Sequence, residues 1–191
     1  MDPNPAASIG LNWAYELPFG KGRQLLNGNS RVVNAVVSGW KINGFVKYNS
    51  GVPLTISGGV GSLGTIGYSQ WANSVPGVSP YLVTSPGDVA LNSTKYLNAA
   101  AFTTTTGFNF GNLNNNLSWV RGFWYKEEDL TVGRVFRVTE QVKLDLSMDA
   151  ANPFNFHRWM NPNTSLTSGQ FGIVSSVVNA RTLQVNAAIR F

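Results

Sequence analysis

Residues 181–191 read RTLQVNAAIRF, and from Thr182 onward their side chains alternate between polar and apolar with a single exception, Ala188. Successive side chains of a β-strand point to opposite sides of the sheet, so strict alternation predicts a strand with one apolar and one polar face. The apolar positions are Leu183, Val185, Ala187, Ile189 and Phe191. The opposite positions are Thr182, Gln184, Asn186, Ala188 and Arg190.

Four further segments alternate in the same way: residues 9–17, 40–48, 125–138 and 142–149. In the third of these, Arg134 shares the apolar side with Leu130, Val132 and Phe136. Two interpretations are open here. Gly133 forms a bulge that re-aims the strand, or Arg134 lies near a membrane surface.

The predicted strands and their connections indicate a membrane barrel. Strands of about 9–11 residues cross a bilayer when tilted, whereas strands of globular proteins have about 5–6 residues. Thr139 and Glu140 form a tight turn, but residues 51–120 and 153–180 are long connections on the opposite side. Residues 18–38 are a longer turn on the short-turn side. Because outer-membrane barrels have short periplasmic turns and long external loops, we expect residues 51–120 to be an extracellular loop.

The predicted fold class is therefore all-β: an antiparallel up-and-down transmembrane β-barrel segment of about five long strands. Closing a barrel takes about eight strands, so we expect an incomplete barrel. Aromatic residues toward the strand ends suit the interfacial girdles of such barrels, although they equally suit the core of a soluble sandwich. These residues are Trp13, Tyr15, Trp40, Tyr48, Trp124 and Tyr125.

Composition excludes several other classes. Of the 191 residues 43% are hydrophobic, 12% are aromatic and only 12% are charged, which is neither the composition of a disordered chain nor that of a helical bundle. The formal net charge is +5, but the basic residues are scattered singly, so no nucleic-acid partner is expected. Cysteine is absent, so thiolate metal sites and thiol catalysis are excluded.

A series of motifs resembles a known family. Residues 11–22 (LNWAYELPFGKG), 39–44 (GWKING) and 50–55 (SGVPLT) are followed by 96–102 (YLNAAAF), 129–132 (DLTV), 152–155 (NPFN) and 171–174 (FGIV). Their order along the chain is similar to that of Oar-like TonB-dependent outer-membrane receptors. The resemblance implies a transporter of roughly 22 strands with an N-terminal plug and a segment that contacts TonB.

Within that resemblance, residues 1–191 are expected to be the C-terminal part of the receptor barrel, a fragment without the plug. The alternating last strand also has the form of a barrel-assembly signal, carried by Leu183, Val185, Ala187, Ile189 and Phe191. The expected partners are outer-membrane lipid, the barrel-assembly machinery and, in a full-length receptor, the missing plug and TonB. The expected location is the bacterial outer membrane.

No catalytic, metal or cofactor site is expected, and we predict that the chain is not an enzyme. His157 is the only histidine, and Asp145 and Asp149 are four residues apart on one strand face, which suits lumen lining. Residues 59–64 have dinucleotide-like glycine spacing without the strand and helix that such a motif needs. Residues 112–119 could form a sugar-contacting loop, and the alternative function is a soluble β-sandwich carbohydrate-binding module.

Overall fold

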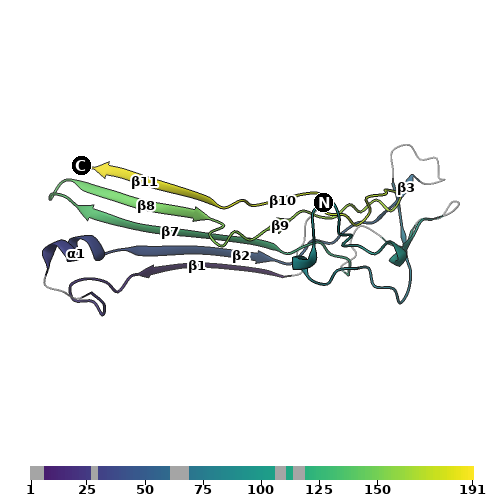
Figure 1. Cartoon of the computed structure of the whole chain (residues 1–191), viewed down its shortest axis with the longest axis horizontal. Coiled ribbons are helices and arrows are strands. Elements are labelled where there is room, and N and C mark those ends of the chain that lie inside the picture. Colours follow the sequence, from purple (N-terminus) through teal and green to yellow (C-terminus); the bar gives the residue numbers. More distant parts are fainter. Residues whose placement is uncertain (1–6, 27–29, 61–68, 106–110, 114–118) are drawn as a thin grey trace. The chain divides into compact units, whose positions relative to one another are not determined.

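The computed structural model describes residues 7–26, 30–60, 69–105, 111–113 and 119–191. Five long strands form one sheet in the order β1-β2-β7-β8-β11, and neighbouring strands run in opposite directions (Figure 1). They are β1 (Ser8–Glu16), β2 (Lys41–Asn49), β7 (Tyr125–Arg137), β8 (Lys143–Ala151) and β11 (Thr182–Arg190). The predicted antiparallel up-and-down segment is confirmed, with strand ends within two residues of the expected positions.

The chain divides into two compact units. The strand unit contains Ile9–Tyr48, Lys126–Phe156 and Asn179–Phe191, and it holds nearly all of the five-stranded sheet. The loop unit contains Met1–Ser8, Asn49–Tyr125 and His157–Val178, which include the two long connections. Each unit is described by itself below.

The pairing of β7 with β8 is continuous from Asp129 opposite Ala151 to Arg137 opposite Lys143. The prediction of a bulge at Gly133 is therefore wrong. Gly133 instead allows a close approach of β8, because a Cβ there would stand 3.2 Å from the Cβ of Ser147. The turn that follows is tight, with the amides of Val138 and Thr139 both donating to the carbonyl of Val142 at 3.0 and 3.1 Å.

A glycine also shapes the pairing of β1 with β2. The Leu17 amide donates to the Trp40 carbonyl at 2.9 Å, and the Ser50 amide donates to the Ala7 carbonyl at 2.8 Å. A regular antiparallel register between these bonds places Trp13 opposite Gly44. The Trp13 indole occupies the space that a Cβ on Gly44 would need. Gly44 is thus the partner that lets a tryptophan lie flat across the strand pair.

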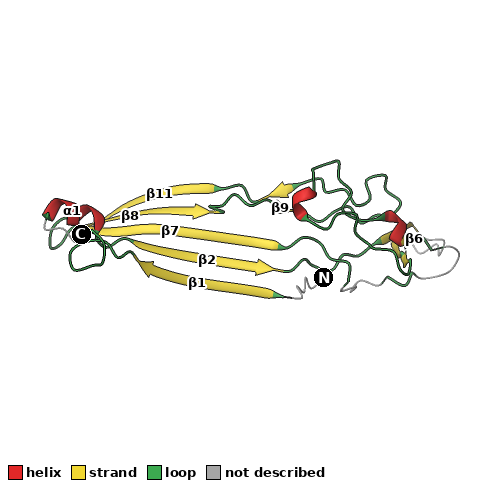
Figure 2. Cartoon of the chain, turned by 60° about the horizontal axis from the view of Figure 1, so that its bottom comes forward, coloured by secondary structure: helices red, strands yellow, loops and turns green. Residues whose placement is uncertain are grey.

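The turn of residues 18–38 contains a helix that the sequence pattern did not predict, α1 (Arg31–Val37). Ser30 caps it, because its hydroxyl accepts from the Val33 amide at 3.4 Å. Figure 2 shows α1 in red at the end of the sheet where β1 ends and β2 begins.

The loop unit contains short elements around a packed core. Three two-stranded sheets pair β3 (Ser57–Val60) with β4 (Ser69–Trp71), β5 (Asn73–Ser74) with β6 (Phe102–Thr103), and β9 (Arg158–Trp159) with β10 (Val177–Val178). Two 3-10 turns are η1 (Pro86–Asp88) and η2 (Ala99–Ala101). The main core consists of Leu54, Ile56, Ala72, Leu97, Ala101, Phe102, Leu113, Val120 and Phe171. Residues 51–120, expected to be irregular, therefore supply most of a conventional hydrophobic core.

Candidate functional site

The register of the sheet collects the alternating residues of β7, β8 and β11 onto two faces. Val132, Met148 and Val185 lie directly opposite one another across the three strands, and Thr131, Asp149 and Gln184 do the same on the other side. We call these sides the apolar face and the polar face. The members of the apolar face on these strands are Leu130, Val132, Arg134, Phe136, Leu144, Leu146, Met148, Ala150, Leu183, Val185, Ala187 and Ile189.

The apolar face is exposed along β1 and β11. Val185 is 78% exposed, Ile189 66% and Leu183 59%, while Ile9 and Leu11 on β1 are 60% and 55% exposed. A soluble sandwich would bury such residues against a second sheet at about 10 Å. A sheet whose alternating apolar face stays uncovered has the surface expected of a barrel wall in lipid.

The residues predicted as the assembly signal lie together on this face. Leu183, Val185, Ala187 and Ile189 follow one side of β11, and Phe191 comes directly after the strand with 98% of its surface exposed. β11 is an edge strand of the sheet. The structure thus places the five side chains where another protein surface could reach them, and their recognition stays a prediction.

The polar face carries a hydrogen-bonded ladder across three strands. The Asp149 carboxylate accepts from the Thr131 hydroxyl and from the Asn186 amide, both at 2.6 Å. The Gln184 amide donates to Asn186 at 2.7 Å. Asp145 instead pairs with Arg190 of β11 at 2.5 Å. The two aspartates therefore have separate partners on the polar face.

The sheet is hollowed on its polar side. A cavity of about 680 Å³ lies there, and all five strands contribute to its lining. Charged and amide side chains dominate the lining, among them Glu16, Lys41, Asn43, Arg137, Lys143 and Arg190. A concave polar surface opposite a bare apolar surface is the arrangement of a water-filled barrel interior.

Arg134 is the charged residue among the members of the apolar face named above. Its guanidinium lies 4.1 Å from the ring centroid of Phe136 and donates to the carbonyl of Val36 in α1 at 2.5 Å. Trp40 donates its indole N–H to the same carbonyl at 2.9 Å and meets Phe136 edge-on, with ring centroids 6.2 Å apart. These contacts place Arg134 at the short-turn end of the apolar face, and its position near a membrane surface stays a prediction.

The other predicted girdle residues lie in different places. Tyr15 is near the end of β1 beside the turn that carries α1, Tyr48 is near the opposite end of β2, and Trp13 lies over Gly44 within the strand pair. Trp124 and Tyr125 belong to the loop unit, where they line a pocket. The girdle interpretation stays a prediction.

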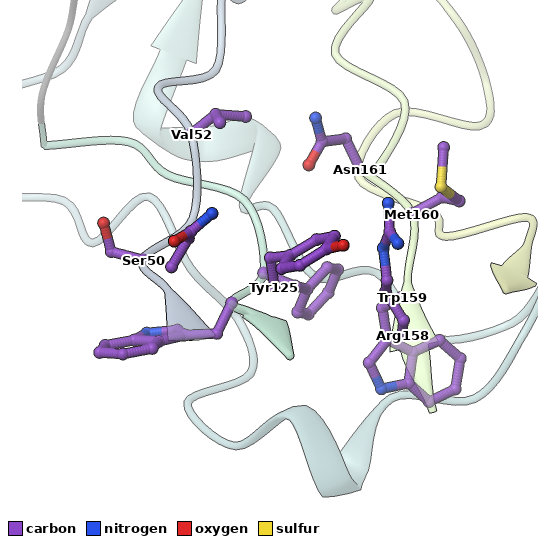
Figure 3. A pocket seen from close by; sticks show the side chains of 10 residues that line it. Ser50, Val52, Tyr125, Arg158, Trp159, Met160 and Asn161 are labelled. Atoms are coloured by element: carbon purple, nitrogen blue, oxygen red, sulfur yellow. The ribbon is translucent and has the colours of Figure 1, made fainter. Parts of the chain in front are cut away.

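That pocket, with a volume of about 280 Å³, is formed by residues 49–52, 123–125 and 158–161 (Figure 3). Arg158 stacks its guanidinium on the Tyr125 ring at 4.1 Å, and Phe123 and Trp159 pack with ring centroids 6.4 Å apart. Trp124 is 54% exposed. Ser50, Asn49 and Asn161 supply polar groups. The aromatic rings of this pocket can stack on a flat ligand, and its amide, hydroxyl and guanidinium groups can donate hydrogen bonds to oxygen atoms of that ligand.

The only resolved pKa shift among the described residues of the loop unit is at Tyr96. Burial, with a smaller contribution from Tyr81, raises the pKa of Tyr96 from 10.0 to about 12. The Tyr96 hydroxyl donates to the Arg121 carbonyl at 3.5 Å, and its ring packs 4.4 Å from that of Phe123. Tyr96 thus supports the Phe123 wall of the pocket as a neutral side chain.

The NPFN segment has a structural role in the strand unit. The Asn152 side chain is 1% exposed, accepts from the Phe156 amide at 2.8 Å and donates to the Phe156 carbonyl at 3.1 Å. It also donates to the Asn179 carbonyl. Asn152 and Asn155 have φ angles of 50° and 55°, which asparagine tolerates better than most residues. These bonds join the end of β8 to the approach of β11.

No other chemical site emerges from the described residues. They contain no group of three or more His, Cys, Asp or Glu side chains that could hold a metal ion. His157 packs edge-on against Trp159 at 5.8 Å. Residues 61–64 of the glycine-rich stretch and residues 114–118 of the predicted sugar-contacting loop lie outside the described residues. No helix in the described part of the chain is long and apolar enough to cross a membrane.

The sequence was also compared with known proteins. A family model described as "Outer membrane beta barrel domain" matches residues 4–184. No curated protein and no solved structure matches the chain.

Proposed function

Because this chain belongs to the outer membrane beta barrel domain family, we propose that it forms barrel wall and ligand-facing external loops of an Oar-like TonB-dependent transporter. Its location is then the bacterial outer membrane. The observation that carries the proposal is the register that collects the apolar residues of neighbouring strands on one exposed face. The soluble β-sandwich alternative is not favoured, since it requires that face to be buried.

Two adjacent alanines on β11 give a matched test of the membrane-wall role. Ala187 lies on the apolar face opposite Leu146, and Ala188 lies on the polar face opposite Asp145. An arginine facing lipid costs about 2–4 kcal/mol near the bilayer midplane, whereas lumen positions tolerate charge. We expect Ala187→Arg to reduce strongly the amount of chain in carbonate-washed outer membranes, and Ala188→Arg to leave it nearly unchanged. Equal amounts for both variants would contradict the assignment of the faces.

The role of β11 in assembly needs a separate test. We propose that the barrel-assembly machinery recognises the exposed side chains of Leu183, Val185, Ala187, Ile189 and Phe191. Residues 183–191 grafted onto a reporter barrel should support its assembly, and Phe191→Ser in the graft should reduce it. Unchanged assembly with Phe191→Ser excludes recognition through that ring.

For the ligand-facing role, the best candidate in the described residues is the pocket around Arg158 and Tyr125. If it contacts the transported ligand, Arg158→Ala should impair ligand uptake by cells that carry the receptor, while Lys95→Ala in the same unit should not. Dependence of that uptake on TonB tests the transporter class itself. Uptake that persists without TonB contradicts a TonB-dependent transporter, but it does not contradict the proposal that the strands form a barrel wall.

A further inference from the structure

Helix α1 exposes apolar side chains to an unusual degree. Val32, Val33 and Val36 are 75%, 44% and 59% exposed, and none of the seven residues of the helix is buried. β-Branched residues are poor helix formers, and helices this short are marginal in water. Helix propensity therefore contributes little to its stability, and its exposed valines suit an apolar environment.

The contacts of α1 place it beside the apolar face. Its Val36 carbonyl accepts from Trp40 at 2.9 Å and from Arg134 at 2.5 Å. Arg134 belongs to the apolar face by register, and Trp40 packs on Phe136 of that face. Both bonds come from the side that meets lipid if the proposed function is correct. The helix therefore lies beside the apolar face, at the end of the sheet where Figure 1 shows it next to the start of β2.

Charge is distributed unevenly along the strand unit. Residues 16–41, 134–145 and 190, at the short-turn end, include eight basic and three acidic side chains. The remaining charged residues of the strand unit are three basic and four acidic. Several of the basic groups face the polar side, but Lys21 and Arg31 lie in the turn itself and Arg134 lies on the apolar face. Positive groups beside an apolar helix complement the phosphates of anionic lipid headgroups.

We propose that α1 is an interfacial anchor that lies in the membrane–water boundary outside the barrel wall. Val32, Val33 and Val36 enter the border of the acyl chains. Lys21, Arg31 and Arg134 bind phosphates of anionic phospholipids, with Arg134 extending along the Phe136 ring toward the headgroups. The proposal rests on the membrane-wall function, and it adds a specific lipid contact at the short-turn end.

The absence of cysteine allows single labels to test the position of the helix. Val33→Cys, Val185→Cys and Glu140→Cys would each carry an environment-sensitive fluorophore, with the chain reconstituted in phospholipid vesicles. We expect the labels at positions 33 and 185 to be quenched by lipid-borne quenchers and the label at position 140 by aqueous ones. If position 33 behaves like position 140 while 185 stays in lipid, the anchor is refuted and the wall survives. If 185 is also in water, the wall proposal fails too.

The lipid charge is tested with Arg31→Gln in the Val33-labelled chain. Removing one basic group near an anionic surface costs about 1 kcal/mol, so the ratio of lipid-exposed to water-exposed label should fall about fivefold. We expect this fall in vesicles that contain phosphatidylglycerol and none in phosphatidylcholine alone. Arg181→Gln, before the opposite end of β11, is the matched control and should change neither. The proposed binding of Arg31 to anionic headgroups is refuted if Arg31→Gln changes the label ratio equally in both kinds of vesicle. It is also refuted if Arg181→Gln changes the ratio as much as Arg31→Gln does.

Discussion

The loop unit leaves Ile56 and Val120 with 0% of their surface exposed, whereas the strand unit leaves Val185 78% and Ile189 66% exposed. Among the buried apolar residues that the structure describes, Ala150 alone belongs to the strand unit. The two units therefore differ in what shields their apolar surface. Protein packs against protein in the loop unit, whereas under the proposed function lipid covers the apolar face of the strand unit.

The charges differ in the same direction. Of the nine acidic and fourteen basic residues, the loop unit contains two acidic and three basic, and the strand unit holds the rest. The strand unit can carry charge because its polar face lines an open hollow, where charged side chains are accessible to solvent. The low overall charge is therefore an average of two different units. Among the described residues, the strand unit is charged and contains no buried apolar cluster, whereas the loop unit is nearly uncharged and contains both clusters.

The largest expected effect comes from one substitution made in both units. Ile56→Ala removes a completely buried side chain from the core of the loop unit and should lower its free energy of unfolding by about 2–5 kcal/mol. Ile189→Ala removes a side chain that touches little protein and should cost less than about 1 kcal/mol. Denaturant unfolding in detergent, followed by hydrogen exchange in each unit, measures both. A large cost at Ile189 would show that protein covers the strand face.

A smaller effect is expected on the polar face. Asp149→Ala leaves the Thr131 hydroxyl and the Asn186 amide without their shared acceptor and should cost about 1–3 kcal/mol. Asp145→Ala should cost at most about 1 kcal/mol, because the side chain of its partner Arg190 is 74% exposed. Hydrogen exchange of the β8 and β11 amides is the measurement. If the amides of β8 and β11 are equally protected from exchange in both variants, water replaces the hydrogen bonds that Asp149 makes with Thr131 and Asn186.

The last expected effect appears only at alkaline pH and is absent at neutral pH. Folding raises the pKa of Tyr96 from 10.0 to about 12, so the unfolded chain releases this proton first. The stability of the loop unit should therefore fall as the pH rises from about 10 to about 12, and be unaffected by Tyr96 below that range. Tyr96→Phe should flatten the fall, while Tyr15→Phe in the strand unit should not. The measurement is denaturant unfolding of the unsubstituted protein and of the two variants at several pH values between about 10 and 12. A fall in stability that Tyr96→Phe does not flatten would contradict the role of Tyr96.

The five long strands could be predicted from the sequence because alternation is local. Val132, Met148 and Val185 belong to one face by the parity of their positions, whatever the rest of the chain does. The same parity places Arg134 on that face, which the register confirms. The prediction of a bulge at Gly133 is wrong. The close approach of Ser147 that Gly133 allows cannot be recognised from the pattern of apolar residues. Helix α1 could not be predicted from the sequence, because four of its seven residues are valines. Valine is enriched in strands, so residue propensities favour a strand over a helix here.

The pocket was missed for a different reason. Arg158 and Tyr125 are far apart in sequence, and neither belongs to a motif with known spacing. Only the packing of the loop unit brings residues 49–52, 123–125 and 158–161 together. The aromatic residues at 123–125 and at 159 can be recognised in the sequence, but no sequence pattern predicts that these two segments meet.

The sequence by itself determined the sheet, since a period of two fixes which side chains share a face without reference to anything distant. It could not determine whether the apolar face points to protein or to lipid, because burial and membrane exposure produce the same alternation. The tertiary structure shows that no described part of the chain covers that face, because it leaves Leu183, Val185 and Ile189 exposed while Ile56, Leu97 and Val120 form a core elsewhere. Burial depends on contacts between residues remote in the chain, and those contacts exist only after folding.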